Sequence, residues 1–189
     1  MKIFLITLLL ATNIAFAQRK FLENICDYNI NATKKAKDVN VKYFVPCLWV
    51  EESSDFPDLL KKYTYTIENG DVLLHTVGIK MYADNISDKD SYEMFSSENM
   101  EKVANGWGYF VSSRRMKIGG KNAVEVIFDS QSNNPTKNIR TMLVFLTYKN
   151  KLIVLSFAAV SLSKENSVRT FNRFQPLFTT LILKTKIYL

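Results

Sequence analysis

The chain has a single histidine, two cysteines, six glycines and four prolines among its 189 residues. One histidine excludes a metal site built from several histidines and permits at most one histidine-based catalytic triad. Two cysteines are too few for a small domain held together by many disulfides. With 47% hydrophobic and 23% charged residues, the composition is that of a globular protein and excludes a disordered chain or a collagen-like repeat.

Motifs that mark common catalytic and nucleotide-binding sites are also missing. The sequence contains no G-x-S-x-G, H-E-x-x-H, paired C-x-x-C, P-loop or G-x-G-x-x-G. The acidic run at 84–90 lacks the glycine and glutamate of an EF-hand loop, and Asp88 and Asp90 fit the first turn of a helix better. The adjacent Glu51 and Glu52 would point to opposite faces of a strand, which disfavours a glycosidase carboxylate pair. We therefore expect no metal, no cofactor and no catalytic centre.

The longest apolar run without charges at the start of the chain resembles a targeting segment. Lys2 precedes a largely apolar stretch at 3–10, and small residues stand at Ala15 and Ala17. This order of a basic residue, an apolar run and an A-x-A site is typical of a secretory signal peptide, here residues 1–17. The run is shorter than the roughly 20 residues of a transmembrane helix, although an uncleaved membrane anchor is the alternative.

Cleavage of this peptide would leave residues 18–189, and the loss of Lys2 would lower the formal charge from +7 to +6. No second stretch is long and apolar enough to cross a bilayer, so we expect no transmembrane span after cleavage. The short basic region of the peptide looks bacterial. The sequence therefore predicts an exported protein, periplasmic or secreted.

Export gives the two cysteines an expected role. Disulfides persist in oxidising compartments outside the cytoplasm, so Cys26 and Cys47 are predicted to pair. A bridge across a loop of this size would stabilise the fold by about 3 kcal/mol. The alternative is that both are buried thiols that pack as small apolar groups.

The segment between the signal peptide and residue 41 has weak signals. Residues 18–40 form an N-terminal segment with a possible short helix at 18–26 and a basic cluster at Lys34, Lys35 and Lys37. From 41 to 189 we expect one α+β domain, because domains of this length are common.

The first half of that domain begins with strands. Residues 41–51 are rich in β-branched and aromatic types, but Pro46 would place them at an edge or break them into two pieces. The alternation on both sides of Asn69-Gly70 predicts a β-hairpin over 61–82. The spacing of apolar residues over 87–104 then predicts a helix, with a left-handed stop at Asn105-Gly106.

The second half is predicted to hold four antiparallel strands and a final helix. The strands are expected at 107–118, 121–129, 139–148 and 152–161, with a polar loop at 130–138. The last two strands are apolar at nearly every position, which predicts central strands with helices on both sides. A helix is expected over 163–184, with a kink or a break at Pro176. The fold class is thus α+β, a mainly antiparallel sheet flanked by helices on both faces.

Several segments resemble the PsbP-like family of α-β-α sandwich proteins, over residues 41–184. The resemblance rests on PCLW at 46–49 with the hairpin after it, IGGKNAVEV at 118–126, KLIVLSFAA at 151–159 and FNRFQPLFTTLI at 171–182. These are fold-forming segments, so the resemblance implies the α-β-α architecture and transfers no functional residue. It implies a binding or accessory role more often than an enzyme.

The basic and aromatic residues around 107–115 form the candidate binding surface. Arg114 and Arg115 lie close in sequence to Trp107 and Tyr109. Basic and aromatic residues together are also typical of nucleic-acid surfaces, but export argues against that partner. An envelope protein or an anionic envelope component fits the charge better, and an ordinary solvated basic surface is the simplest alternative.

These observations predict an exported, non-enzymatic binding or accessory protein of the bacterial envelope. One version is a periplasmic inhibitor or immunity protein directed against an acidic toxin. A different class is a hydrolase that uses His75, which lies within a predicted strand. The sequence leaves the oligomeric state open.

Overall fold

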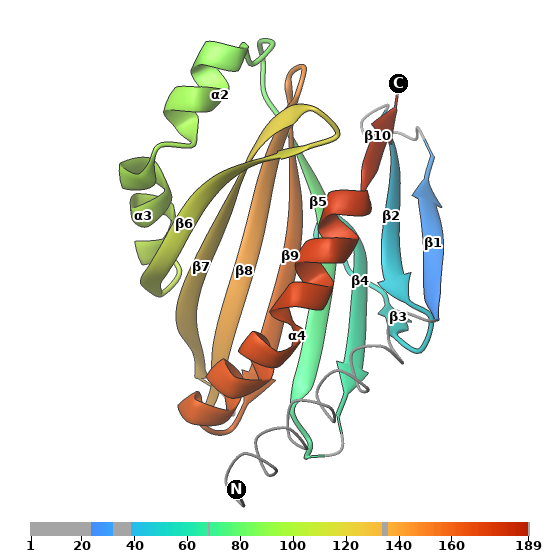
Figure 1. Ribbon diagram of the computed structural model, residues 1–189, viewed down its shortest axis with the longest axis vertical. Coiled ribbons are helices and arrows are strands. Elements are labelled where there is room, and N and C mark those ends of the chain that lie inside the picture. Colours follow the sequence, from blue (N-terminus) through green and yellow to red (C-terminus); the bar gives the residue numbers. More distant parts are fainter. Residues whose placement is uncertain (1–23, 32–38, 68, 134–135, 189) are drawn as a thin grey trace, which may run out of the picture.

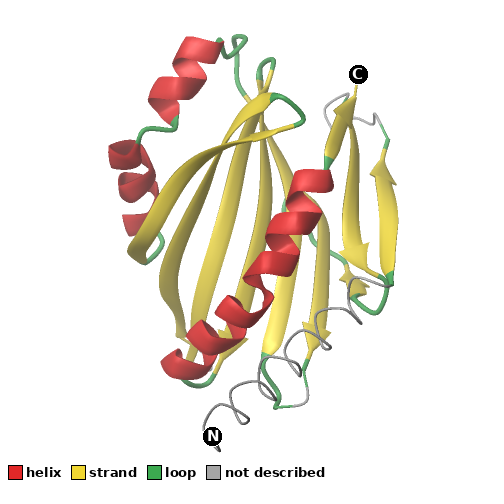
Figure 2. Cartoon of the chain, in the orientation of Figure 1, coloured by secondary structure: helices red, strands yellow, loops and turns green. Residues whose placement is uncertain are grey.

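The computed structural model describes residues 24–31, 39–67, 69–133 and 136–188. The predicted signal peptide at 1–17 and the basic cluster at 34–37 lie outside the described residues. The described chain forms two antiparallel sheets and three helices, arranged in layers (Figures 1 and 2).

The smaller sheet has the order β1-β2-β10 and the larger sheet the order β3-β4-β5-β9-β8-β7-β6. The strands of the smaller sheet are β1 (Ile25–Ile30), β2 (Asn40–Pro46) and β10 (Lys186–Tyr188). The strands of the larger sheet are β3 (Val50–Glu52), β4 (Leu59–Thr66), β5 (Val72–Met81), β6 (Tyr109–Ile118), β7 (Lys121–Asn133), β8 (Thr136–Tyr148) and β9 (Lys151–Ser161). The helices are α2 (Asp88–Met94), α3 (Ser97–Asn105) and α4 (Lys164–Lys184).

The predicted fold class is confirmed. All strand pairs in both sheets are antiparallel. Helix α4 crosses one face of the large sheet diagonally and contacts β8, β9 and β2, while α2 and α3 lie on the other face near β6 and β7 (Figure 1). The two apolar strands β8 and β9 are central, as their continuous apolar sequences predicted.

Alternating side chains of the large sheet enter two separate cores. On the α4 face, Phe157 and Met142 pack with Phe171 and Phe178 of α4. On the opposite face, the core is built from α2, α3, β7, β8 and β9; its buried members are Phe95, Met100, Ala104, Val124, Val126, Phe128, Leu143, Phe145 and Leu152. Where β8 and β9 contribute to both cores, both faces of the strand are covered, which explains the apolar residues at every position there.

The N-terminal strands β1 and β2 form the small sheet together with β10. Strand β2 packs against α4 and adds its buried side chains to the core on that face. The predicted short helix at 18–26 is wrong where the structure describes it, because Ile25 and Cys26 belong to β1. Residues 41–51 are broken at Pro46 as predicted, and the two pieces enter different sheets. The missing N–H of proline ends the β2 ladder there.

The predicted disulfide between Cys26 and Cys47 is formed, with an S–S distance of 2.07 Å and a Cα–Cα distance of 4.9 Å. It links β1 to the turn that follows β2. A backbone hydrogen bond of 2.8 Å from the Cys47 N–H to the Asn24 carbonyl supports the same junction. The bridge therefore fastens β1, an edge strand of the small sheet, to the end of β2.

The predicted hairpin at 61–82 is confirmed as β4 and β5. Its turn is joined to α4 by the buried Asp71, whose carboxylate accepts a 2.7 Å hydrogen bond from the Thr170 hydroxyl and a 2.9 Å bond from the Asn69 side chain. Burial alone raises the pKa of Asp71, but hydrogen bonds from Ser161, Thr170 and Asn69 outweigh it and leave the pKa below its ordinary value. The charged carboxylate thus positions α4 on the sheet.

The single helix predicted over 87–104 is wrong, because the segment forms two short helices, α2 and α3. Ser96 caps the start of α3, accepting from the Asn99 N–H at 3.3 Å, and the Asn99 side chain donates to the Glu93 carbonyl of α2 at 3.0 Å. These bonds satisfy both helix ends at the break. The cap at Ser87 is confirmed, with a reciprocal bond to Asp90.

Two other boundaries differ from expectation. Gly106 has φ −69°, so the predicted left-handed stop is wrong and the chain leaves α3 through a right-handed turn. The polar loop predicted at 130–138 is also wrong, because β7 and β8 continue as a paired ribbon as far as Asn133 opposite Thr136. Backbone pairing between two long strands continues past the apolar core because polar side chains at a sheet end remain in solvent.

Helix α4 runs unbroken from Lys164 to Lys184 and contains Pro176, so the alternative of two consecutive helices is wrong. Ser163 caps its start as predicted, accepting from the Asn166 N–H at 3.3 Å. Within the described residues, no helix combines the length and apolar character needed to cross a bilayer.

Candidate binding surface on strand β6

Strand β6 forms one edge of the large sheet and carries most of the residues of the predicted binding surface. Trp107, just before the strand, is 56% exposed and Tyr109, its first residue, is 78% exposed. Val111 follows at a β-bulge and is also exposed. Large apolar side chains left in solvent at a sheet edge are typical of interaction surfaces.

A close backbone contact positions the two aromatic residues. A Cβ atom at Gly108 would lie 2.0 Å from the carbonyl oxygen of Asp129, so only glycine fits between Trp107 and Tyr109. The Trp107 ring lies on the α3 side, 5.9 Å from the ring centroid of Phe128. Tyr109 is opposite Asp129 in the ladder. The two rings therefore flank the edge from either side.

Arg114 faces the α4 side of the sheet and forms a bidentate ion pair. Its Nε and Nη2 donate to the two carboxylate oxygens of Glu125 at 2.9 and 3.1 Å. The side chain of Glu125 is only 5% exposed, whereas that of Arg114 is 57% exposed. Two of the five guanidinium N–H groups serve this pair, which leaves others available to a ligand.

Arg115 faces the opposite side of the sheet, and its side chain binds the end of α2. Its Nε and Nη2 donate to the backbone carbonyls of Phe95 and Tyr92 at 3.1 and 2.9 Å. Its guanidinium also lies 3.6 Å from the ring centroid of Tyr92. The structure therefore separates the two arginines, since consecutive residues of a strand point to opposite faces.

Replacing Arg115 with alanine is expected to loosen α2 without unfolding the protein. The substitution removes both hydrogen bonds to the end of α2 and the contact with Tyr92. Because these groups are partly exposed, we expect a loss of about 1 kcal/mol in the free energy of unfolding. Hydrogen exchange should accelerate at the α2 amides and stay unchanged in β8 and β9. Unchanged exchange in α2 would contradict this role.

A second ion pair, which no sequence pattern indicates, lies beside Tyr109. Arg140 of β8 donates from Nε and Nη2 to Asp129 of β7 at 2.7 and 2.8 Å. Both side chains are largely buried. Nothing in the sequence pairs these residues, because their meeting depends on the β7–β8 register.

Strand β6 offers three kinds of contact to a partner. Its outer edge has no neighbouring strand among the described residues, so its backbone can hydrogen-bond an extended chain. Trp107 and Tyr109 offer aromatic faces, and Arg114 offers a cation suited to carboxylate or phosphate. The bulge at Val111 and the basic side chains also discourage edge-to-edge pairing with further copies.

His75 lies in the core and not on a surface. It is 4% exposed, and its ring packs between Tyr63 and Phe178, at centroid distances of 6.5 and 5.9 Å. Its Nδ1 lies 2.6 Å from the backbone carbonyl of Ser156, an arrangement in which Nδ1–H donates. Burial lowers the pKa of His75 to about 4, and the bond to Ser156 only partly opposes this shift.

This lowered pKa predicts a pH-dependent stability. Between the unfolded pKa of 6.5 and the folded value of about 4, the unfolded chain takes up a proton that folded His75 does not. The contribution of neutral His75 to the free energy of unfolding should therefore be fully present above pH 6.5. Below that pH the free energy of unfolding should fall, by about 2 kcal/mol between about pH 7 and about pH 5. Urea unfolding of the wild type and of His75→Gln measures this, and the variant should lack this part of the slope. An equal slope in both proteins would contradict the assignment.

A cluster of tyrosines lies next to His75, between the two sheets. The hydroxyl oxygens of Tyr43 and Tyr63 are 2.5 Å apart, and Tyr63 also donates to Glu51 at 3.3 Å. Burial raises the pKa of Tyr43 to about 12 and raises that of Tyr63 further. The tyrosines are therefore neutral, and they satisfy one another's hydrogen bonds. Glu51 and Glu52 point to opposite faces as predicted, since they pair with Tyr63 and Lys62.

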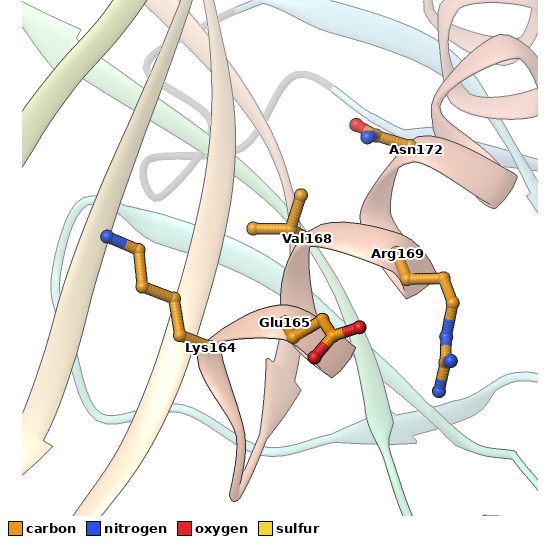
Figure 3. A pocket seen from close by; sticks show the side chains of 5 residues that line it. All are labelled: Lys164, Glu165, Val168, Arg169 and Asn172. Carbon is orange, nitrogen blue, oxygen red and sulfur yellow. The ribbon is translucent and has the colours of Figure 1, made fainter.

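A shallow depression on the outer surface of α4 is lined by Lys164, Glu165, Val168, Arg169 and Asn172. In Figure 3 Lys164 points to one side, while Glu165 and Arg169 lie on the other. All of these described lining residues belong to one helix, so we assign no function to the depression. Among the described residues, no group of three histidine, cysteine, aspartate or glutamate side chains is placed to hold a metal ion.

No protein-family model matches the chain, and no curated protein sequence matches it. Solved structures are similar to it at low identity. LpqN of Mycobacterium tuberculosis, described as involved in cell envelope biogenesis, shares 15% identity and a TM-score of 0.50, over 89% of this chain and 95% of that one. This likeness shows the fold alone.

Two further structures have lower scores. A protein of unknown function from Pseudomonas aeruginosa, PA94, described as a putative regulator, has 11% identity and a TM-score of 0.48, over 85% of this chain and 95% of that one. The Saccharomyces cerevisiae Ran-binding protein Mog1p has 13% identity and a TM-score of 0.47, over 86% of this chain and 95% of that one.

Proposed function

We propose that this chain is an exported, non-enzymatic binding or accessory domain of the bacterial envelope that contacts its partner through β6. The observation that carries the proposal is the pair of exposed aromatic residues, Trp107 and Tyr109, at the start of β6, which has no outer neighbour among the described strands. Neither side chain is a member of either core, and although the Trp107 ring contacts Phe128, more than half of each side chain stays in water, where it adds little to folding. A partner that covers them would gain apolar contact area.

Two further observations support this proposal. The Cys26–Cys47 disulfide is consistent with an oxidising compartment outside the cytoplasm. LpqN, whose fold is similar, is described as involved in cell envelope biogenesis. The titratable groups with the strongest perturbation, His75 and Tyr63, are buried and satisfied by neighbouring groups, which favours a binding role over catalysis.

The preferred partner is an acidic protein or an anionic envelope component. Arg114 supplies an exposed guanidinium next to the aromatic residues, and the chain as a whole carries a formal charge of +7. Charge of this sign steers anionic partners toward the surface at low ionic strength. Binding through β6 should therefore weaken as salt is added.

Site-specific crosslinking in the envelope tests the proposal. A photoreactive amino acid replaces Tyr109 in one variant and Phe56, an equally exposed aromatic residue beyond the opposite edge strand, in a matched control. We expect a discrete crosslinked product from position 109 that is absent from position 56 and disappears in Trp107→Ala. Equal products at both positions, or substrate turnover by the purified protein, would contradict the proposal.

A further inference from the structure

The face of the large sheet opposite α4 is only partly covered by helices. The hydrophobic core beneath α2 and α3 includes residues of β7, β8 and β9 but none from β3, β4 or β5. In Figure 1, α2 and α3 lie beside β6 and β7, far from β4 and β5 across the sheet. Part of this face therefore has no helical layer among the described elements.

We call this area the uncovered face. Its side chains share one side of five neighbouring strands, as fixed by the ladder register and the alternation along each strand. They are Val50 of β3, Thr64 and Thr66 of β4, Val72, Leu74 and Thr76 of β5, Ser156, Ala158 and Val160 of β9, and Ile139 and Thr141 of β8. None of them belongs to either hydrophobic core.

The register arranges these residues in rows across the strands. Thr64 is opposite Leu74, which is opposite Ala158, which is opposite Thr141. The neighbouring rows have the same mixture of β-branched, small and hydroxyl-bearing side chains. Short side chains of this kind give a smooth surface, and most are half-buried by their neighbours. Such a surface is suited to packing against another sheet.

None of the side chains named for the uncovered face is charged. Glu52 and Lys62 at one margin form an ion pair, and the Glu52 carboxylate also accepts a 2.6 Å bond from Thr64. Lys137 of β8 lies on the same side of the sheet, beyond Ile139. Lys80 stands beyond the end of the face and extends over the Tyr82 ring. In a chain with a formal charge of +7, a neutral area is where two copies can meet without repulsion.

The area is large enough for a weak but specific interface. Strands lie about 4.8 Å apart and rise about 3.3 Å per residue, so five strands over about six residues cover roughly 24 by 20 Å. Two such faces would bury roughly 1,000 Å² in total, which is at the lower limit for a biological interface. Glu52 and Lys62 bound the face at its β3–β4 margin.

We propose that two copies of this chain form a two-fold dimer by packing their uncovered faces against each other. Strands β3, β4, β5, β9 and β8 of one copy then face the same five strands of the other copy. The apolar side chains interdigitate between sheets about 10 Å apart. The threonine and serine hydroxyls hydrogen-bond within or across the interface, so no charge is buried. A two-fold axis brings the residues next to it near their own counterparts, which makes the centre of the interface sensitive to a new charge. This surface is distinct from β6, so the dimer stands independently of the proposed function.

Sedimentation velocity over a dilution series tests the dimer by measuring the mass of the exported protein, purified after processing by the cell. We expect the mass of two chains at high concentration. Leu74→Lys, in the middle of the face, should raise the dissociation constant at least about 100-fold, since like charges meet at the axis. The matched control Leu183→Lys, on the exposed side of α4, should leave the dissociation constant unchanged.

Thermal melting followed by circular dichroism establishes that each variant is folded, and Thr66→Lys, at an already exposed position, replaces Leu74→Lys where the latter does not fold. Added salt should strengthen the wild-type dimer, because it screens repulsion between two basic chains, in contrast to binding through β6. A single-chain mass at the highest soluble concentration would overturn the proposal. So would a dimer that Leu74→Lys and Thr66→Lys leave intact, or protection of this face by a different protein only.

Discussion

Phe178→Ala is expected to lower the free energy of unfolding by about 4 kcal/mol, the range found when a buried phenylalanine is removed. Phe178 is 1% exposed on α4 and stacks on Phe157 of β9 at a centroid distance of 3.5 Å. The same ring contacts Trp49 and His75, at 5.3 and 5.9 Å. One side chain thus joins α4 to the large sheet and to the turn before β3, and its loss leaves a cavity at their junction.

Urea unfolding followed by circular dichroism measures this effect. Phe56→Ala is the matched control, because Phe56 is the same residue type but 75% exposed, and it should change the stability by less than about 0.5 kcal/mol. A loss below about 1 kcal/mol for Phe178→Ala would mean that α4 does not pack on the sheet as described. The comparison separates burial from aromatic character.

Replacing both Cys26 and Cys47 with alanine is expected to lower the free energy of unfolding by about 3 kcal/mol, because the open chain gains the loop entropy that the bridge removes. The bond spans 21 residues and holds β1 on β2. Beyond the disulfide, β1 contributes mostly half-exposed side chains to the fold. Hydrogen exchange should therefore accelerate in β1 more than in β8 or β9.

Reducing agent supplies the control for this prediction. It should lower the stability of the wild type to that of the double variant and leave the double variant unchanged. A wild type that is insensitive to reduction under unfolding conditions, or a double variant of wild-type stability, would contradict a stabilising bridge. Either outcome would also weaken the case for an oxidising compartment.

Local sequence patterns were reliable where a short segment decides its own structure. Asn69-Gly70 predicted the β4–β5 turn because few residues adopt the required backbone, and Ser87 and Ser163 predicted helix starts through their hydroxyl caps. The unbroken apolar runs of β8 and β9 predicted central strands because side chains on both faces of these strands enter a core in the middle of each strand. The errors at 87–104 and 130–138 arose where polar residues fit either structure, and contacts with other elements decided between the two.

The candidate binding surface shows the same division. Trp107, Tyr109 and Arg114 could be chosen from the sequence because aromatic and basic residues stand close together in it. The partners of the two arginines could not be predicted, since Arg115 reaches the end of α2 and Arg114 reaches Glu125 only through the fold. A partly uncovered sheet face could not be predicted from the sequence, because an apolar strand has the same kind of sequence whether a helix or a partner protein covers it.

The sequence by itself determined the composition class, the α+β order of elements, the helix caps, the hairpin turn and the candidate disulfide, because these follow from residues near one another in the chain or from residue chemistry. Only the tertiary structure decided that His75 is buried between Tyr63 and Phe178, and that Arg114 pairs with Glu125 while Arg115 binds the end of α2. It also decided that, among the described elements, no helix covers β3, β4 and β5 on the face opposite α4. Those features depend on strand register and helix docking, which bring together residues tens of positions apart. The physical reason is that a side chain's type predicts what it can do, while its neighbours in space decide what it does.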